Sequence, residues 1–144
     1  MQSVCTEIDI DASIGEVWKV ISALESWPSW NDVVRKMTAR PSLGGKVAFR
    51  IHIDGLPGLA LAARISEWEP EKGLAWRGGP KAIFSGNHYF RLEARGDDRT
   101  RFIHGEDFTG VVAALLMRGG MMDRLKTSYD RFNRSLKKHI ELAH

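Results

Sequence analysis

Residues 110–144 read GVVAALLMRGGMMDRLKTSYDRFNRSLKKHIELAH. Bulky side chains recur here at steps of three and four, at Met122, Leu125, Tyr129, Phe132, Leu136 and Ile140. This spacing places them on one stripe of an α-helix, and the residues between them are mostly charged. Unbroken, such a helix would be roughly 45 Å long at about 1.5 Å per residue. A long one-sided helix needs a broad partner. We therefore expect the stripe to be buried against a sheet, and the opposite face to be exposed at Arg124, Arg131 and Lys138.

Two glycines interrupt the stripe. Gly119 stands where a bulky apolar residue is expected, and glycine in a helix interior costs about 1 kcal/mol relative to alanine. Three interpretations are open. Gly119 leaves space for a ligand beneath the helix, or it divides the helix, together with Gly120, into a short lid and a long anchor. In the third, the position simply tolerates drift.

The residues before this helix alternate between apolar and polar as β-strands do. Residues 4–10 predict a half-buried strand, and Ser13 with Glu16 forms a capping box that opens a short helix. Residues 27–31, WPSWN, predict a second short helical turn or a bend. From residue 33 to residue 108, about six strands follow between glycine- and proline-rich turns. The order predicts one α+β domain over residues 1–144, with an antiparallel sheet, two short helices after its first strand and a long C-terminal helix.

Composition excludes several classes of protein. Hydrophobic residues make up 43% of the chain and charged residues 27%, which is ordinary for a folded domain and argues against disorder. The longest apolar run, residues 111–117, is too short to span a membrane, and residues 1–3 do not begin a secretory leader. The lone Cys5 cannot form an internal disulfide, and no spacing predicts a metal site or another cofactor. We therefore expect a cytoplasmic protein. The net charge of +3 is too small to predict nucleic-acid binding.

Several short motifs occur together in the order of a known superfamily. They are residues 8–13 (IDIDAS), 16–18 (EVW), 27–31 (WPSWN), 74–78 (LAWRG), His88 with Phe90, 100–102 (TRF), His104, Glu106, Phe108 and Gly110, and Asn133 with residues 136–137. These motifs span the chain, and through them the sequence resembles the START-like, or SRPBCC, superfamily. The closer similarity is to the bacterial polyketide cyclase/dehydrase and lipid-transport group. Most of the motifs mark turns, caps or core positions, so they indicate the fold more strongly than the function.

The resemblance implies a helix-grip fold, in which a curved antiparallel sheet wraps around the C-terminal helix and leaves a cavity between them. It also implies ligands such as lipids, sterols, quinones, polyketides or plant hormones. A minority of members catalyse cyclisation or dehydration in that cavity. The glycine pair at 119–120 is where this chain departs from the family pattern, and it puts the continuity of the helix in doubt.

Three ionisable side chains, His88, His104 and Glu106, share strand faces with large apolar residues. If those faces point inward, period-two alternation brings the three polar groups inward too. A three-residue loop at residues 97–99 would pair Phe90 with Glu106, making His88 and Glu106 diagonal neighbours. A buried histidine beside a carboxylate suits a general acid or base, so His88 and Glu106 are the catalytic candidates. The same pair also suits the polar corner of a binding pocket.

The residues expected to contact a ligand come from the strands and from the last helix. They are Trp30, Phe49, Ile51, Trp76, His88, Phe90, His104, Glu106, Leu116 and Gly119. Met117, Met121 and Met122 could add an adaptable wall, although methionine also fills gaps in ordinary cores. Arg50, His52 and Arg64 are expected on the outer, solvated face of the sheet.

Three functional hypotheses follow. In the first, the chain is a non-enzymatic carrier or sensor of a small apolar ligand, held between the sheet and the C-terminal helix. In the second, it is a cyclase or dehydratase that acts on a polyketide-like substrate through His88 and Glu106. In the third, the cavity is vestigial and the basic helix face meets a protein partner. The sequence does not indicate an oligomeric state.

Overall fold

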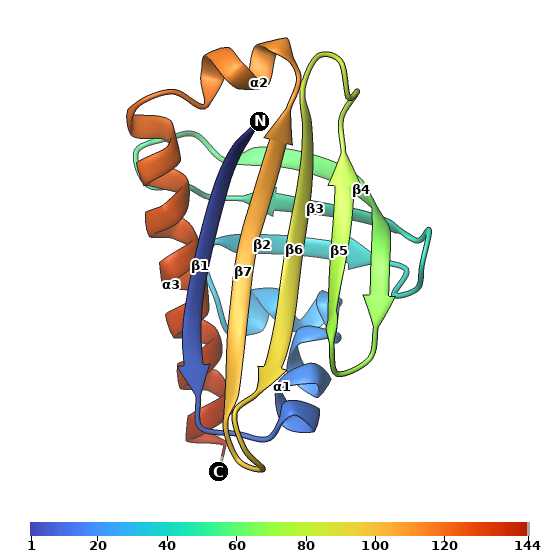
Figure 1. Cartoon of the computed structure of the whole chain (residues 1–144), viewed down its shortest axis with the longest axis vertical. Coiled ribbons are helices and arrows are strands. Elements are labelled where there is room, and N and C mark those ends of the chain that lie inside the picture. Colours follow the sequence, from blue (N-terminus) through green and yellow to red (C-terminus); the bar gives the residue numbers. More distant parts are fainter. Residues whose placement is uncertain (144) are drawn as a thin grey trace.

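The computed structural model describes residues 1–143. Within them, seven strands form one antiparallel sheet in the order β1-β7-β6-β5-β4-β3-β2 (Figure 1). The strands are β1 (Gln2–Ile10), β2 (Val34–Ala39), β3 (Lys46–Ile51), β4 (Leu59–Glu69), β5 (Gly73–Gly78), β6 (Ser85–Ala94) and β7 (Thr100–Thr109). The predicted α+β class is confirmed.

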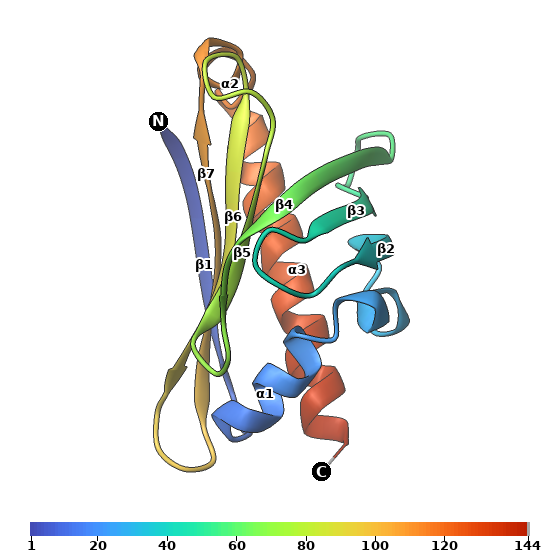
Figure 2. The same cartoon turned by 90° about the vertical axis from the view of Figure 1, so that its right-hand side faces the viewer.

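The sheet bends sharply at β4. The pairing of β4 with β5 shifts register between Ile65 and Glu67, and such a bulge bends the strand that carries it. Figure 2 shows the result: β2 and β3 lie on the opposite side of the C-terminal helix from β1, β6 and β7. The sheet therefore wraps around the helix, which confirms the helix-grip arrangement.

The two short helices follow β1, as predicted. Helix α1 (Ile14–Ile21) begins at the cap Ser13, whose hydroxyl oxygen accepts a hydrogen bond from the backbone N–H of Glu16 at 3.3 Å. A 3-10 helix, η1 (Leu24–Ser29), contains Pro28 and buries Trp27 completely. The indole N–H of Trp27 donates to the carbonyl oxygen of Ile21, so the buried ring keeps its polar atom satisfied.

The long C-terminal helix α3 (Gly120–Leu142) places its apolar stripe as the sequence predicts. Phe132, Leu136 and Ile140 are buried against the sheet, while Arg124 and Lys138 are exposed. Arg131 was also expected to be exposed but is half-buried, because its guanidinium reaches across to Asp32 and Asp54. The stripe therefore supplies one wall of the core.

The helical region is broken before α3. A short helix α2 (Val111–Leu116) ends at Met117, and α3 begins after Gly119. Gly119 has φ +58° and ψ −129°, a conformation that side chains rarely adopt. A Cβ built on Gly119 would meet nothing within 4 Å, and the residue lies outside the cavity lining. Gly119 was expected to contact a ligand, but it does not line the cavity and instead stands at the change of direction between two helices.

We expect Gly119→Ala to lower the free energy of unfolding by roughly 1–3 kcal/mol, because a Cβ is strained at this φ and ψ. The matched control is Gly120→Ala. Gly120 begins α3 without a positive φ and also has open space around a Cβ, so its alanine variant should be neutral or slightly stabilising. Urea denaturation of both variants measures the difference. Equal effects of the two alanines would show that the break does not depend on the backbone of Gly119.

Candidate functional site

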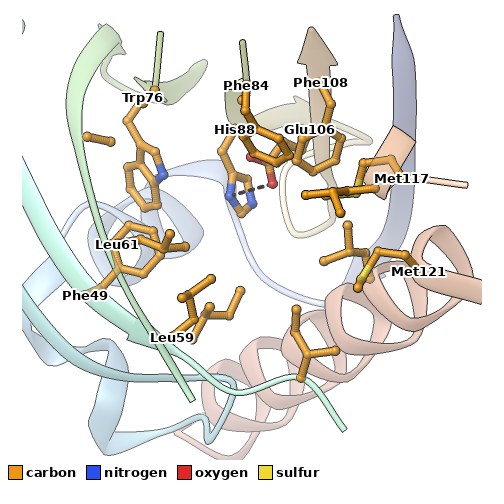
Figure 3. Close-up of a pocket in the computed structure, with 18 of the residues that line it drawn as sticks. Phe49, Leu59, Leu61, Trp76, Phe84, His88, Glu106, Phe108, Met117 and Met121 are labelled. Atoms are coloured by element: carbon orange, nitrogen blue, oxygen red, sulfur yellow. Dashed lines mark ion pairs between the residues drawn. The ribbon is translucent and has the colours of Figure 1, made fainter. Parts of the chain in front are cut away.

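A cavity of about 370 Å³ lies between the bent sheet, α2 and the first turns of α3 (Figure 3). Its lining is mostly aliphatic and aromatic: Phe49, Ile51, Ile53, Leu56, Leu59, Leu61, Ala63, Trp76, Phe84, Phe108, Leu116, Met117, Met121 and Leu125. Three polar side chains also line it, His88 from β6, Glu106 from β7 and Tyr129 from α3. Figure 3 shows His88 beside Glu106, with Trp76 on one side and Phe108 on the other. The site is thus an apolar cavity with a single polar corner.

Six of the ten residues expected to contact a ligand line this cavity: Phe49, Ile51, Trp76, His88, Glu106 and Leu116. Their strands and helix bring them together from five separate elements. Met117 and Met121 line it as well, whereas Met122, the third methionine expected in the adaptable wall, is absent from the lining and packs against the cluster that includes Leu125 and Tyr129. Whether any of these residues binds a ligand stays a prediction.

The other four expected residues lie elsewhere. Gly119 is outside the lining for the reason given above. Trp30 packs on Phe132 and stacks on His139, with ring centroids 5.1 Å and 5.9 Å away, at the far side of the core. Phe90 and His104 lie on the inner face of the sheet, as predicted, but they are buried in the core beyond the end of the cavity. They surround a void of only about 10 Å³, which is too small for a ligand.

The hairpin between β6 and β7 turns one residue earlier than the sequence analysis expected. The amide of Arg95 donates to the carbonyl of Arg99, so the turn comprises residues 96–98, with Gly96 at φ +115°. His88 consequently pairs directly with Glu106, and Phe90 pairs with His104. The predicted diagonal relation between His88 and Glu106 is wrong, and the two side chains are closer than it implied.

Glu106 is the acidic group of the polar corner. Its Oε1 accepts a hydrogen bond from the hydroxyl of Tyr129 and lies 3.5 Å from Nδ1 of His88. Burial raises the pKa of Glu106 to about 7, with a smaller contribution from Asp107, while the hydrogen bond from Tyr129 opposes the rise. At neutral pH this carboxyl is therefore close to half protonated, which is unusual for a glutamate.

Tyr129 was assigned only to the apolar stripe of the last helix, so the sequence analysis missed its hydroxyl as a site group. The available signal was chemical: a buried tyrosine hydroxyl normally finds a hydrogen-bond partner, and Glu106 was a candidate partner. Leu59 and Leu61 were missed too, although they stand on either side of Ala60, which is absent from the lining, as cavity-facing residues of a strand should.

Behind the corner, a chain of buried polar groups extends from His88 toward α3 and β1. Nε2 of His88 lies 2.7 Å from Nε2 of His104, whose Nδ1 lies 2.9 Å from Oδ1 of Asn133. The amide nitrogen of Asn133 donates to the hydroxyl of Thr6 at 2.8 Å. Burial lowers the pKa of His88 well below its usual value, and it lowers that of His104 to about 3. Both imidazoles are therefore neutral at pH 7.

The lining restricts the chemistry available to the cavity. Among the described residues, no lysine, arginine, serine, threonine or cysteine lines it. Residues 1–143 contain no group of three or more side chains placed to hold a metal ion. The groups that can exchange a proton with a ligand are Glu106, His88 and Tyr129.

The mouth of the cavity is apolar as well. Leu59 is 55% exposed and Leu116 is 54% exposed although both line the cavity, so their side chains face an open rim.

Over residues 1–143, no helix is both long enough and apolar enough to cross a membrane.

Comparison with known proteins gives the same architecture. A family model described as polyketide cyclase / dehydrase and lipid transport matches residues 1–141. A search of curated proteins found no significant match. Among solved structures, a START superfamily protein from Mycobacterium smegmatis superposes with a TM-score of 0.78 at 16% identity, covering 99% of both chains. The Zhui aromatase/cyclase from Streptomyces sp. R1128 gives 0.74 at 16% identity, covering 97% of this chain and 93% of that one. A Thermus thermophilus protein, TTHA0849, gives 0.79 at 16% identity, covering 99% of both chains.

At such low identity the solved structures establish the fold alone. The family model covers almost the whole chain and agrees with the motifs in the sequence. By this match, the chain belongs to the polyketide cyclase/dehydrase and lipid-transport family.

Proposed function

We propose that this protein binds a small, mostly apolar ligand in the cavity, with the ligand's polar end at Glu106, and acts as a carrier or sensor. The observation that supports this most directly is the cavity itself. Its volume of about 370 Å³ falls in the range of small-molecule sites, and its apolar lining converges on one polar corner. Leu59, Leu61 and Leu116 extend the apolar surface to the mouth, where a ligand would enter.

A binding role fits the polar corner better than a catalytic one does. Covalent catalysis often uses a serine, threonine, cysteine or lysine nucleophile, and the described lining contains none of these four residue types. One ring nitrogen of His88 is already held by His104, which leaves only Nδ1 to face the corner. Structural pairs of this kind also shift pKa values, so a shifted value does not by itself indicate catalysis.

A second candidate is a dehydratase or cyclase, and the pKa of Glu106 favours it. A carboxyl with a pKa of about 7 is a competent general acid at neutral pH. In a dehydration, Glu106 would give its proton to a leaving hydroxyl group, which departs as water. Nδ1 of His88 would take the proton from the neighbouring carbon, which leaves a carbon–carbon double bond.

The surface gives less support to an interaction module. Several charges on the outer face of α3 are paired within the protein, as Lys126 is with Asp130 and Lys137 with Glu141. A paired, solvated face is the ordinary state of such a helix. The volume of the cavity also argues against calling it vestigial. The cytoplasmic location stays a prediction.

Binding of 2-acetylnaphthalene, an uncharged aromatic ketone, tests the proposal. We expect one molecule to bind per chain, and His88→Gln to weaken binding by about 1–2 kcal/mol because it disturbs the polar corner. Native mass spectrometry of the freshly purified protein should also show a retained small molecule. Absence of binding to the wild-type protein would contradict the carrier role.

The retained molecule also separates carrier from enzyme. A carrier should return it unchanged after prolonged incubation. A dehydratase should convert it to a product lighter by one water, and His88→Gln should then lower turnover by roughly 100-fold or more while nearly preserving affinity.

A further inference from the structure

The direction of every hydrogen bond in the buried chain behind the cavity follows from one atom, the backbone carbonyl oxygen of His104. A carbonyl oxygen only accepts, so the hydroxyl of Thr6, 2.8 Å away, must donate to it. That hydroxyl has a single hydrogen. Toward Asn133 it can therefore only accept, and Asn133 must turn its amide nitrogen to Thr6. The amide oxygen of Asn133 is left facing the ring of His104.

The tautomers of both histidines are then fixed. The amide oxygen of Asn133 only accepts, so Nδ1 of His104 carries a hydrogen. Since His104 is neutral and carries its hydrogen on Nδ1, its Nε2 is unprotonated and can only accept. Nε2 of His88, 2.7 Å away, must therefore carry the hydrogen of the bond between the two rings. His88 is neutral too, so its Nδ1 is unprotonated. This unprotonated nitrogen is the atom that faces Glu106.

An unprotonated nitrogen cannot donate a hydrogen bond to a carboxylate. An ionised Glu106 would therefore receive a hydrogen bond from Tyr129 while facing the unprotonated nitrogen of His88. In a cavity with apolar walls, such a poorly solvated charge is costly. The protonated carboxyl avoids this cost, and Asp107, which precedes Phe108 on β7, opposes ionisation further. The described lining contains no lysine or arginine whose positive charge could stabilise the ionised carboxylate.

We propose that Thr6 and Asn133 are positioning residues that fix the tautomer of His88 and thereby favour the protonated form of Glu106, which is a hydrogen-bond donor. The ligand that this corner takes is uncharged and carries a carbonyl-type oxygen at its polar end. A carboxylate would meet no cationic side chain among the described lining residues. An alkyl end would offer no acceptor to a proton on Oε2 of Glu106, the carboxyl oxygen that does not accept from Tyr129. This ligand class rests on the proposed binding function, whereas the tautomers do not.

The tautomers can be measured directly in the wild-type protein. Long-range ¹H–¹⁵N correlation spectra of the histidine rings distinguish protonated from unprotonated nitrogens, and His88→Gln assigns the resonances of His88. Between about pH 6 and pH 8, we expect the hydrogen of His104 on Nδ1 and that of His88 on Nε2. A hydrogen on Nδ1 of His88 would overturn the proposal, and the tautomer itself is read from the wild-type protein.

Thr6→Val tests the positioning role, with Thr6→Ser as its matched control. Valine keeps the shape of threonine but removes the hydroxyl, so Asn133 loses the partner that fixes its amide. His88 can then carry its hydrogen on Nδ1 and donate it to an ionised Glu106. We expect the pKa of Glu106, followed by ¹³C NMR of its carboxyl carbon, to fall by about one unit. Thr6→Ser keeps the hydroxyl and should leave this pKa in place. An unchanged pKa in a folded Thr6→Val variant would exclude the positioning role.

Three naphthalenes of similar size test the ligand class. At about pH 6, 2-acetylnaphthalene should bind roughly 5- to 10-fold more tightly than 2-ethylnaphthalene, and 2-naphthoate should bind most weakly. The preference for the ketone should disappear as the pH rises through about 7, because Glu106 then loses the proton it donates. In Thr6→Val the same loss should occur about one pH unit lower.

The outcomes separate this inference from the proposed function. A preference for the ketone that is independent of pH, or tighter binding of the naphthoate, would overturn the ligand class but leave a binding function intact. Failure of all three probes to bind would overturn the proposed function and the ligand class together. The tautomer measurement decides the positioning role in either case.

Discussion

Phe132→Ala is expected to lower the free energy of unfolding by about 3–5 kcal/mol. Phe132 is 1% exposed and lies where α3, η1 and the sheet meet. Its ring centroid is 5.0 Å from that of Trp27 and 5.0 Å from that of His104. Truncation would leave a cavity between rigid aromatic rings, which cannot move together to fill it.

Urea denaturation measures this loss, and Lys138→Ala is the control on the same helix. Lys138 is exposed, so its truncation should change the free energy of unfolding by no more than about 0.5 kcal/mol. A loss well below 1 kcal/mol in Phe132→Ala would contradict the packing of α3 against the sheet, on which the rest of the architecture depends.

Most of the fold was predictable because its signals are local and periodic. The stripe of α3 repeats over about six turns, and the capping box at Ser13 marks the start of α1 within one residue. The hairpin register was not predictable in the same way. It depends on which residue takes the positive φ that closes the turn, and Gly96 and its neighbours allowed more than one choice.

The sequence predicted which face of the sheet carries the candidate site, but not how far the cavity extends along that face. Alternation placed His88, His104 and Glu106 on the inner face of the sheet, where all three lie. It could not predict that the cavity reaches His88 and stops before His104. Beside His104, the packing of Trp27, Phe90 and Phe132 leaves a void of only about 10 Å³, and this packing of separate elements is a tertiary feature. Trp30 was misplaced for a related reason, since its direction depends on how η1 packs.

One helix therefore serves two purposes along its length. Toward the C-terminal end of α3, Phe132 and Leu136 fill the space inside the sheet and supply stability. Toward its start, Met121 and Leu125 leave the cavity open. The break at Gly119 allows α2 to turn across this open end and to contribute Leu116 to the lining. Stability and binding can consequently be changed separately.

Ala63→Trp should abolish binding without loss of stability. Ala63 lines the cavity from β4, where it pairs with the fully buried Val47, so an indole at this position would occupy much of the 370 Å³. We expect the affinity for 2-acetylnaphthalene to fall at least about 100-fold, which corresponds to about 2.7 kcal/mol. The thermal midpoint should hold or rise, because the new side chain enters open space and not a filled core.

Ala60→Trp is the matched control for this substitution. Ala60 lies three residues away on the same strand, is exposed, pairs with Arg50 on the outer face and is absent from the cavity lining. It should keep wild-type affinity in the same calorimetric titration. If Ala63→Trp also binds 2-acetylnaphthalene with wild-type affinity, the ligand sits outside this cavity and both functions proposed for it fail. If both variants lose binding, the strand itself has been disturbed. The cavity is then identified as the binding site only when Ala63→Trp alone blocks the probe and still melts cooperatively.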